Sequence, residues 1–218
     1  MAIRFRTVLL ATGALAAGAA PAAAHPHVFA EARLEIATEG ENVQALRHVW
    51  RFDDLFSSTV IFEFDRNKDL KLDAEELEMV GSVILESLAE FDYFQFVTAD
   101  GKDIEMSPPE RIVASLEDQQ LLILFESTPV EELPLAGNLR FGVYDPTFYT
   151  AIDFYDDSNL VVASMPDACA KEVVRPDPDE ALAQNQQTLT EAFFNEPGGV
   201  DYSKLFATRL EITCGASG

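Results

Sequence analysis

Alternating apolar and polar residues predict a β-hairpin near the start of the chain. Residues 28–36 and 43–52 alternate with the period of two that half-buried strands show. A Glu-Gly-Glu-Asn turn lies between them, so the two strands are expected to pair antiparallel. On the second strand His48, Trp50 and Phe52 fall on one face, because side chains alternate along a strand.

The spacing of apolar residues then changes to that of helices. Residues 54–64 are mostly apolar and predict one short helix. From residue 74 to about residue 91, apolar residues recur at intervals of three and four, which predicts an amphipathic helix. These residues are Leu77, Val80, Ile84, Leu88 and Phe91. The chain is therefore expected to carry a helix-loop-helix insertion at about 54–91.

Strand patterns return after this insertion. A polar stretch at 179–195 predicts a C-terminal helix, and the remaining apolar runs predict strands bounded by Pro, Gly, Asn or Asp. The runs are 93–98, 112–116, 121–125, 139–144, 150–155, 160–164 and 207–213, and the Asp100-Gly101 turn after the first run predicts a short return strand. Strands joined by tight turns, with one helical insertion, predict an α+β fold with a mainly antiparallel sheet. Residues 25–218 are expected to form a single domain.

The first 24 residues have the pattern of a cleaved secretory signal peptide. Arg4 and Arg6 precede a short apolar stretch, and the small residues at 22–24 suit signal peptidase. Cleavage after Ala24 would leave His25 at the new N-terminus and place the protein in the periplasm. The alternative is an uncleaved anchor, although the stretch falls short of the about 20 strongly apolar residues that span a bilayer. No later run approaches that length, so no membrane insertion is expected after cleavage.

The charge of the chain excludes some partners and favours others. Its formal net charge is −23, and removal of Arg4 and Arg6 would take it to −25. Such a chain lacks the basic surface that nucleic acids and anionic lipids require. It suits cations, although acidic surfaces also serve to keep secreted proteins dispersed.

The two cysteines of the chain, Cys169 and Cys214, lie far apart in sequence. In an oxidising compartment an even pair predicts a disulfide. The alternative, two thiolate ligands of a metal, has no Cys-x-x-Cys spacing to support it.

Residues 65–76, named here the acidic loop, have the spacing of an EF-hand calcium loop. Oxygen donors occupy positions 1, 3, 5, 9 and 12, and position 7 contributes only a main-chain carbonyl. In that order these residues are Asp65, Asn67, Asp69, Asp73, Glu76 and, at position 7, Lys71. A hard cation such as calcium binds six to eight oxygens, which a coiled loop presents from alternating positions.

One residue of the acidic loop departs from this pattern. Position 6 is Leu70, where the sharp turn normally requires glycine. A left-handed backbone costs a non-glycine residue about 1–2 kcal/mol, which predicts weakened calcium binding. An acidic helix-start loop that binds no metal is the alternative.

The histidines form a second candidate metal site. His25, His27 and His48 are the only histidines of the chain, and two of them lie at the predicted N-terminus. A terminal amine with imidazole can chelate zinc, nickel, cobalt or copper. Pro26 has no amide hydrogen, so the site must use side chains and the amine. His48 is expected to complete it if the hairpin brings the end of its second strand to the start of its first. Each histidine taken alone is equally an ordinary surface or cleft side chain.

Several segments resemble a bacterial family of unknown function, described as periplasmic components of an uncharacterised ABC-type transport system. The resemblance rests on the His-Pro-His-Val-Phe start at 25–29, the acidic loop, the two cysteines and three further segments: 48–53 with Phe56-Ser57, Tyr93-Phe94 and 144–149. It implies a role in transition-metal handling and an inner-membrane permease as partner. It also adds Asp145, in the last of those segments, as a candidate ligand, although Asp-Pro is an ordinary turn starter.

The sequence thus predicts a binding protein rather than an enzyme. It contains no Gly-x-Ser-x-Gly elbow, no His-Glu-x-x-His motif and no free cysteine nucleophile paired with histidine. Copper oxidation at a terminal histidine brace is the one enzymatic alternative. The favoured function is an accessory or substrate-binding component of a transition-metal transport system. A calcium-stabilised envelope adaptor without a transport role is the alternative.

Overall fold

The structure, a computed structural model, describes residues 26–195 and 203–215 and contains two β-sheets and a helical lobe. The predicted signal peptide and His25 lie outside the described residues. Among the described helices none is long and apolar enough to cross a bilayer.

The first sheet is built on the predicted hairpin. Strands β1 (Val28–Glu39) and β2 (Asn42–Phe52) pair antiparallel, and the strand order is β10-β1-β2-β6-β5. Its other strands are β5 (Val113–Glu117), β6 (Gln120–Ser127), β7 (Leu133–Pro134), β9 (Thr150–Asp153) and β10 (Leu160–Val162). Strand β7 pairs with β2, whereas β9 and β10 both run parallel to β1.

The second sheet has the order β11-β12-β8-β3-β4 and is antiparallel throughout. Its strands are β3 (Gln95–Ala99), β4 (Lys102–Asp103), β8 (Gly137–Val143), β11 (Cys169–Val174) and β12 (Arg209–Cys214). The predicted α+β class with mainly antiparallel pairing is confirmed, and the sheet proves to be two sheets. Strands β7 and β11 were not predicted.

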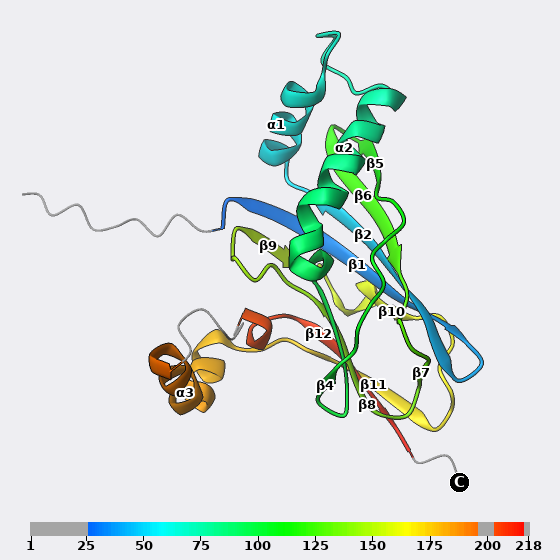
Figure 1. Cartoon of the computed structure of the whole chain (residues 1–218), viewed down its shortest axis with the longest axis vertical. Coiled ribbons are helices and arrows are strands. Elements are labelled where there is room, and N and C mark those ends of the chain that lie inside the picture. The colour runs from blue at the N-terminus through cyan, green and yellow to red at the C-terminus, as the bar shows by residue number, and fades with distance from the viewer. Residues whose placement is uncertain (1–25, 196–202, 216–218) are drawn as a thin grey trace, which may run out of the picture.

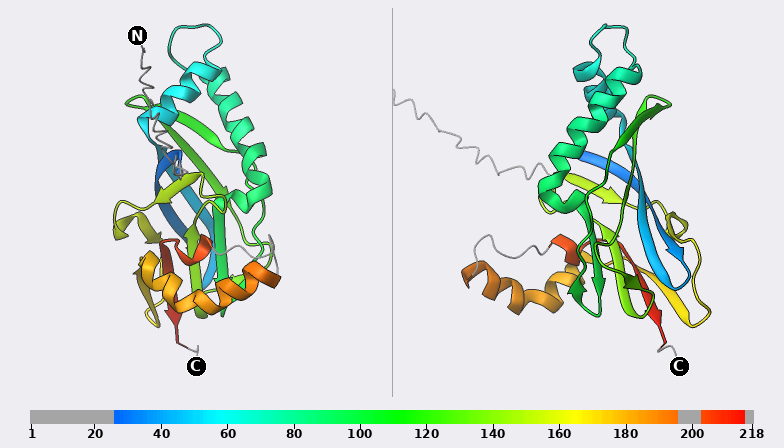
Figure 2. Two further views of the ribbon diagram at one scale, coloured as in Figure 1. Left: turned by 90° about the vertical axis from the view of Figure 1, so that its left-hand side faces the viewer. Right: turned by 45° about the vertical axis from the view of Figure 1, so that its right-hand side comes forward.

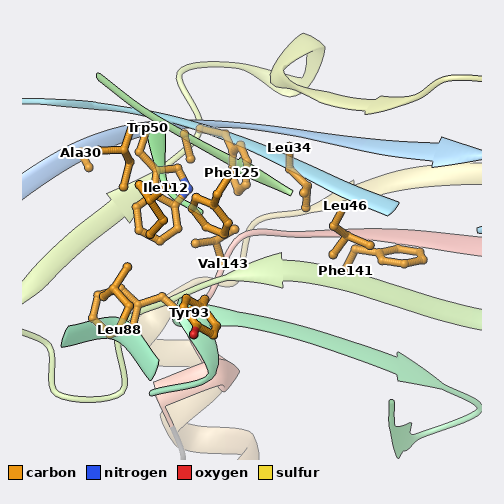
Figure 3. Close-up of a cluster of buried hydrophobic side chains, with 14 of the residues drawn as sticks. Ala30, Leu34, Leu46, Trp50, Leu88, Tyr93, Ile112, Phe125, Phe141 and Val143 are labelled. Carbon is orange, nitrogen blue, oxygen red and sulfur yellow. The ribbon is translucent and has the colours of Figure 1, made fainter. Parts of the chain in front are cut away.

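The main hydrophobic core joins the two sheets. Figure 3 shows Leu34, Leu46 and Trp50 of the first sheet in one cluster with Phe141 and Val143 of the second. All five are buried, because the apolar positions of each alternating strand turn toward the other sheet.

The helical lobe consists of α1 (Asp54–Phe64), the acidic loop and α2 (Ala74–Leu88), and its existence and its first residue agree with the predicted insertion. It projects at one end of the molecule with the acidic loop outermost (Figure 1). Both helices have an aspartate N-cap, Asp53 for α1 and Asp73 for α2, which accepts hydrogen bonds from the first free main-chain N–H groups. The predicted helix continued to about residue 91, where the structure has a 3₁₀ segment, η1 (Ala89–Phe94).

The C-terminal helix α3 (Pro178–Asn195) agrees with the polar helical stretch that was predicted. It lies beside the second sheet, away from the helical lobe (Figure 2). Two short 3₁₀ turns, η2 (Asp157–Asn159) and η3 (Ser203–Leu205), complete the elements.

The predicted disulfide is present. Cys169 and Cys214 are joined, and they are also directly paired partners of β11 and β12. The bond therefore fixes one end of the pairing between the edge strand β11 and its neighbour. A disulfide of this kind is typical of proteins from oxidising compartments.

Candidate functional site

The acidic loop makes its sharp turn without glycine. Leu70 has a φ of 63°, in the left-handed region where the sequence pattern normally places glycine. The carboxylate of Asp65 holds the turn: one oxygen accepts a hydrogen bond from the main-chain N–H of Leu70 at 2.7 Å, and the other from that of Asp69 at 3.2 Å. The geometry that position 6 requires is therefore present, at a cost in backbone strain.

Glu76 ties the two ends of the acidic loop together. Its side chain is buried, with one carboxylate oxygen accepting from the N–H of Arg66 at 2.7 Å and the other from the N–H of Asp73 at 2.9 Å. Asp73 in turn accepts from the N–H groups of Glu75 and Glu76, which completes a capping box at the start of α2. The carboxylate of Glu76, the last donor of the calcium pattern, thus links the main chain at positions 2 and 9 of the loop.

The donors of the acidic loop fit a hard cation in kind. All are oxygens: four carboxylates, the amide of Asn67 and the main-chain carbonyl of Lys71. The side-chain oxygens of Asp65, Asn67 and Asp69 accept hydrogen bonds from main-chain N–H groups of the loop. In residues 26–195 and 203–215 no group of three or more His, Cys, Asp or Glu side chains is gathered as a metal site.

His27 lies on the surface immediately before β1. Its main-chain N–H donates to the carbonyl of Tyr149 at 2.8 Å, and the centroids of the two rings are 5.0 Å apart. The path of the chain just after His25 is therefore fixed against the segment that contains Tyr149.

The structure separates His48 from His27, so the expected meeting of these two histidines is wrong. β2 continues four residues beyond His48, and the register places His48 opposite Leu34 in the middle of β1. Its side chain faces the core with Leu34, whereas the alternation that buries Val28 turns His27 outward. His48 is therefore not a partner of His27, and His25 lies outside the described residues.

His48 is a core residue with polar partners. It is 1% exposed, its ring stacks on Phe125 at 4.4 Å, and Nε2 lies 3.1 Å from the side-chain oxygen of Gln95. That oxygen also accepts from the hydroxyl of Ser127 at 2.6 Å. Burial lowers the pKa of His48 to about 4, so the ring is neutral at ordinary pH.

A cleft of about 490 Å³ lies between the helical lobe and the first sheet. Its walls are mostly aromatic and aliphatic, and they come from the start of β1, from β2, α1, α2 and η1, and from the 145–150 segment. Its principal wall residues are Trp50, Phe56, Phe64, Ile84, Phe91 and Phe94. Such a mainly apolar concavity with few polar groups is the usual form of a binding site.

Asp145 lines this cleft, and its carboxylate is bonded within its own turn. It accepts from the N–H and hydroxyl of Thr147 at 2.7 and 2.6 Å, and from the N–H of Thr150 at 2.7 Å. These bonds shape the 145–150 segment, which supports the turn-forming interpretation of Asp-Pro.

Backbone strain adjoins the cleft at the end of η1. Asp92, Tyr93 and Phe94 all have positive φ values, of 49°, 56° and 55°. Consecutive left-handed residues other than glycine persist only where the surroundings fix them. Here Tyr93 and Phe94 are buried, and the carbonyl of Phe94 accepts from the N–H of Tyr144 at 2.7 Å.

The cleft was not predicted, although the segments that line it had been noticed separately. Val28, Trp50, Phe56, Phe94 and Tyr149 each come from one of the segments that carried the family resemblance. Those segments are spread over more than a hundred residues of sequence and meet at this one place. Their joint occurrence was the only sequence feature that pointed to it.

Two comparisons with known proteins extend over most of the chain. Residues 10–214 match the profile of a family described as "Protein of unknown function (DUF1007)". A Haemophilus influenzae protein described as "Uncharacterized protein" is 23% identical over 193 residues, which cover 88% of this chain and 91% of that protein.

Proposed function

Because the chain belongs to the DUF1007 family of proteins of unknown function, we propose a function from its own residues: a periplasmic divalent-cation-binding protein that serves as an accessory component of a transition-metal transport system. The acidic loop is the observation that carries the cation-binding part. It combines five side-chain oxygen donors at EF-hand spacing with a left-handed residue at position 6. The permease partner follows from the family resemblance of the sequence.

A calcium ion at the acidic loop would be held by Asp65, Asn67, Asp69, Asp73 and Glu76, with the carbonyl of Lys71. It would supply positive charge where carboxylates crowd between two helices. Extracellular calcium modules bind with dissociation constants of about 10⁻⁴–10⁻³ M, and a strained loop belongs in that range.

Calorimetric titration of the purified protein with calcium chloride tests this assignment. We expect saturable heat that Asp65→Ala abolishes, because Asp65 both ligates and holds the turn. Asp167→Ala is the matched control, since Asp167 is an exposed aspartate outside the loop. Absence of heat, or equal heat from both variants, would remove the loop from the proposal.

The processed N-terminus is the proposed transition-metal site. The terminal amine and imidazole of His25 with the imidazole of His27 offer nitrogen ligands for zinc, nickel, cobalt or copper. His48 is omitted, because its ring is buried away from His27. The position of His27 on the surface against Tyr149 favours this smaller site.

N-terminal sequencing of protein from the periplasm, followed by metal titration, tests this site. We expect the chain to begin at His25 and to bind one of these metals, with loss of affinity in His27→Ala and after acetylation of the amine. A start at another residue, or unchanged affinity in both altered forms, would refute it.

A calcium-stabilised adaptor is the second candidate function. One feature of the helical lobe favours it: α1 exposes large apolar side chains, with Leu55 75% and Phe62 84% exposed. Surfaces of this kind in a folded protein mark contact sites for other molecules.

A further inference from the structure

The helical lobe exposes apolar side chains in two places, the cleft and the outer face of α1. The apolar residues of α1 lie on more than one side of the helix, yet only Ser57, Val60 and Ile61 of it are buried. Apolar residues on more than one side of a helix are expected to be covered, whereas Leu55 and Phe62 are left exposed by the described residues. Across the cleft, Val83 of α2 is a half-exposed rim residue.

The walls of the cleft carry negative charge only. Every charged residue of α1, α2 and η1 is an aspartate or a glutamate. None of these carboxylates forms an ion pair with the described residues. Glu63 and Asp145 are the charged residues that line the cleft itself. The basic residues of this part of the chain, Arg66, Lys68 and Lys71, all lie in the acidic loop.

Trp50 lines the cleft and carries a buried indole donor. Its side chain is 1% exposed, and its indole N–H has no hydrogen-bond partner among the described residues. A buried donor of this kind is normally paired. The negative charge around the cleft, rather than this N–H, therefore decides the chemistry of its occupant.

We propose that this cleft docks an amphipathic segment of another protein, with an apolar face that enters the cleft and Lys or Arg residues beside that face. Apolar anchors of a helix laid in a groove match the aromatic walls, and basic residues match the unpaired carboxylates. A second copy of this chain is a poor occupant, because its net charge of −23 would place like charges against those walls. The inference extends the adaptor function and does not depend on the acidic loop holding an ion.

Trp50 provides the assay, because it is the only tryptophan of the chain and lies on the cleft wall. The probe is a helical peptide of leucine and lysine with one apolar face. Two control peptides are a scrambled sequence of the same composition and a leucine–glutamate peptide of the same pattern. Fluorescence of the full mature protein is measured as each peptide is added, once in calcium and once in a chelator.

Val83→Lys is the test variant, since it places a positive charge on the cleft rim. Val130→Lys is the matched control, because Val130 is a similarly exposed valine that does not line the cleft. We expect saturable binding of the leucine–lysine peptide, weakened tenfold or more by Val83→Lys and unchanged by Val130→Lys. Binding that persists in the chelator and in Asp65→Ala keeps this inference standing even if the loop proposal fails.

Three results would overturn the assignment. One is no saturable change with the leucine–lysine peptide, and another is equal binding of all three peptides. The third is a fluorescence change that follows protein concentration alone and disappears in Val83→Lys, which would identify a second copy as the occupant.

Discussion

Replacement of Leu70 by glycine should stabilise the protein. Leu70 holds a left-handed backbone, which costs a residue with a Cβ atom about 1–2 kcal/mol and costs glycine almost nothing. Glycine loses about 0.5–1 kcal/mol more backbone entropy on folding than other residues. The side chain of Leu70 is 71% exposed, so little apolar burial is lost with it. The net expectation is a gain of about 0.5–1 kcal/mol in the free energy of unfolding.

Thermal and urea unfolding of Leu70→Gly measure this gain directly. For a domain of this size a change of 1 kcal/mol moves the melting temperature by about 2–4 °C, so a rise of about 1–4 °C is expected. Leu70→Ala is the control, because alanine loses the same side chain and keeps the same backbone cost. A lower melting temperature in Leu70→Gly, or an equal rise in Leu70→Ala, would show that backbone strain at this position is not what limits stability.

Three further changes test what stabilises the fold around the proposed sites. Burial holds the pKa of His48 near 4 against 6.5 when unfolded, so protonation favours the unfolded chain. The free energy of unfolding therefore keeps its full value with respect to His48 above pH 6.5 and falls by about 3 kcal/mol as the pH approaches 4. Urea unfolding at different pH values should show a smaller loss in His48→Phe. A double Cys169→Ser/Cys214→Ser variant should lose about 4 kcal/mol by the same measurement, because the bond closes a separation of 45 residues. Gly81→Ala should lower the melting temperature although alanine favours helices, because a Cβ atom at this position would overlap a main-chain carbonyl of the neighbouring segment. Ser82→Ala is the control, since Ser82 is an exposed neighbour, and it should leave the melting temperature unchanged.

The sequence predicted the elements whose patterns are local. The hairpin, the α1 helix at 54–64 and the acidic loop all follow from residues close together in the chain. The N-caps Asp53 and Asp73 show why the helix starts agree so well, because a cap acts on the N–H groups two and three residues away. The end of α2 was less predictable, because burial of Tyr93 and Phe94 in left-handed conformations overrides the helical pattern.

Pairing between distant strands could not be predicted in the same way. β9 and β10 lie parallel to β1 although more than a hundred residues separate them in sequence. β11 was missed because its short run has no clear alternation, and pairing with β12 is what makes it a strand. The predicted meeting of His48 with His27 was wrong for the same reason, because it depends on strand register rather than on the local pattern.

The position of the acidic loop leads to a coupling between the two proposed sites. The loop joins α1 to α2, and both helices wall the cleft. An ion bound by both Asp65 and Glu76 restrains the ends of these helices. The lobe then loses less conformational entropy when a segment docks. We expect the leucine–lysine peptide to bind several-fold more tightly in calcium than in a chelator. Linkage then requires the peptide to raise calcium affinity by the same factor. Asp65→Ala should remove this difference while leaving the weaker binding intact. Equal peptide affinity in calcium and chelator, in a protein that binds calcium at the loop, would show that the two sites act separately.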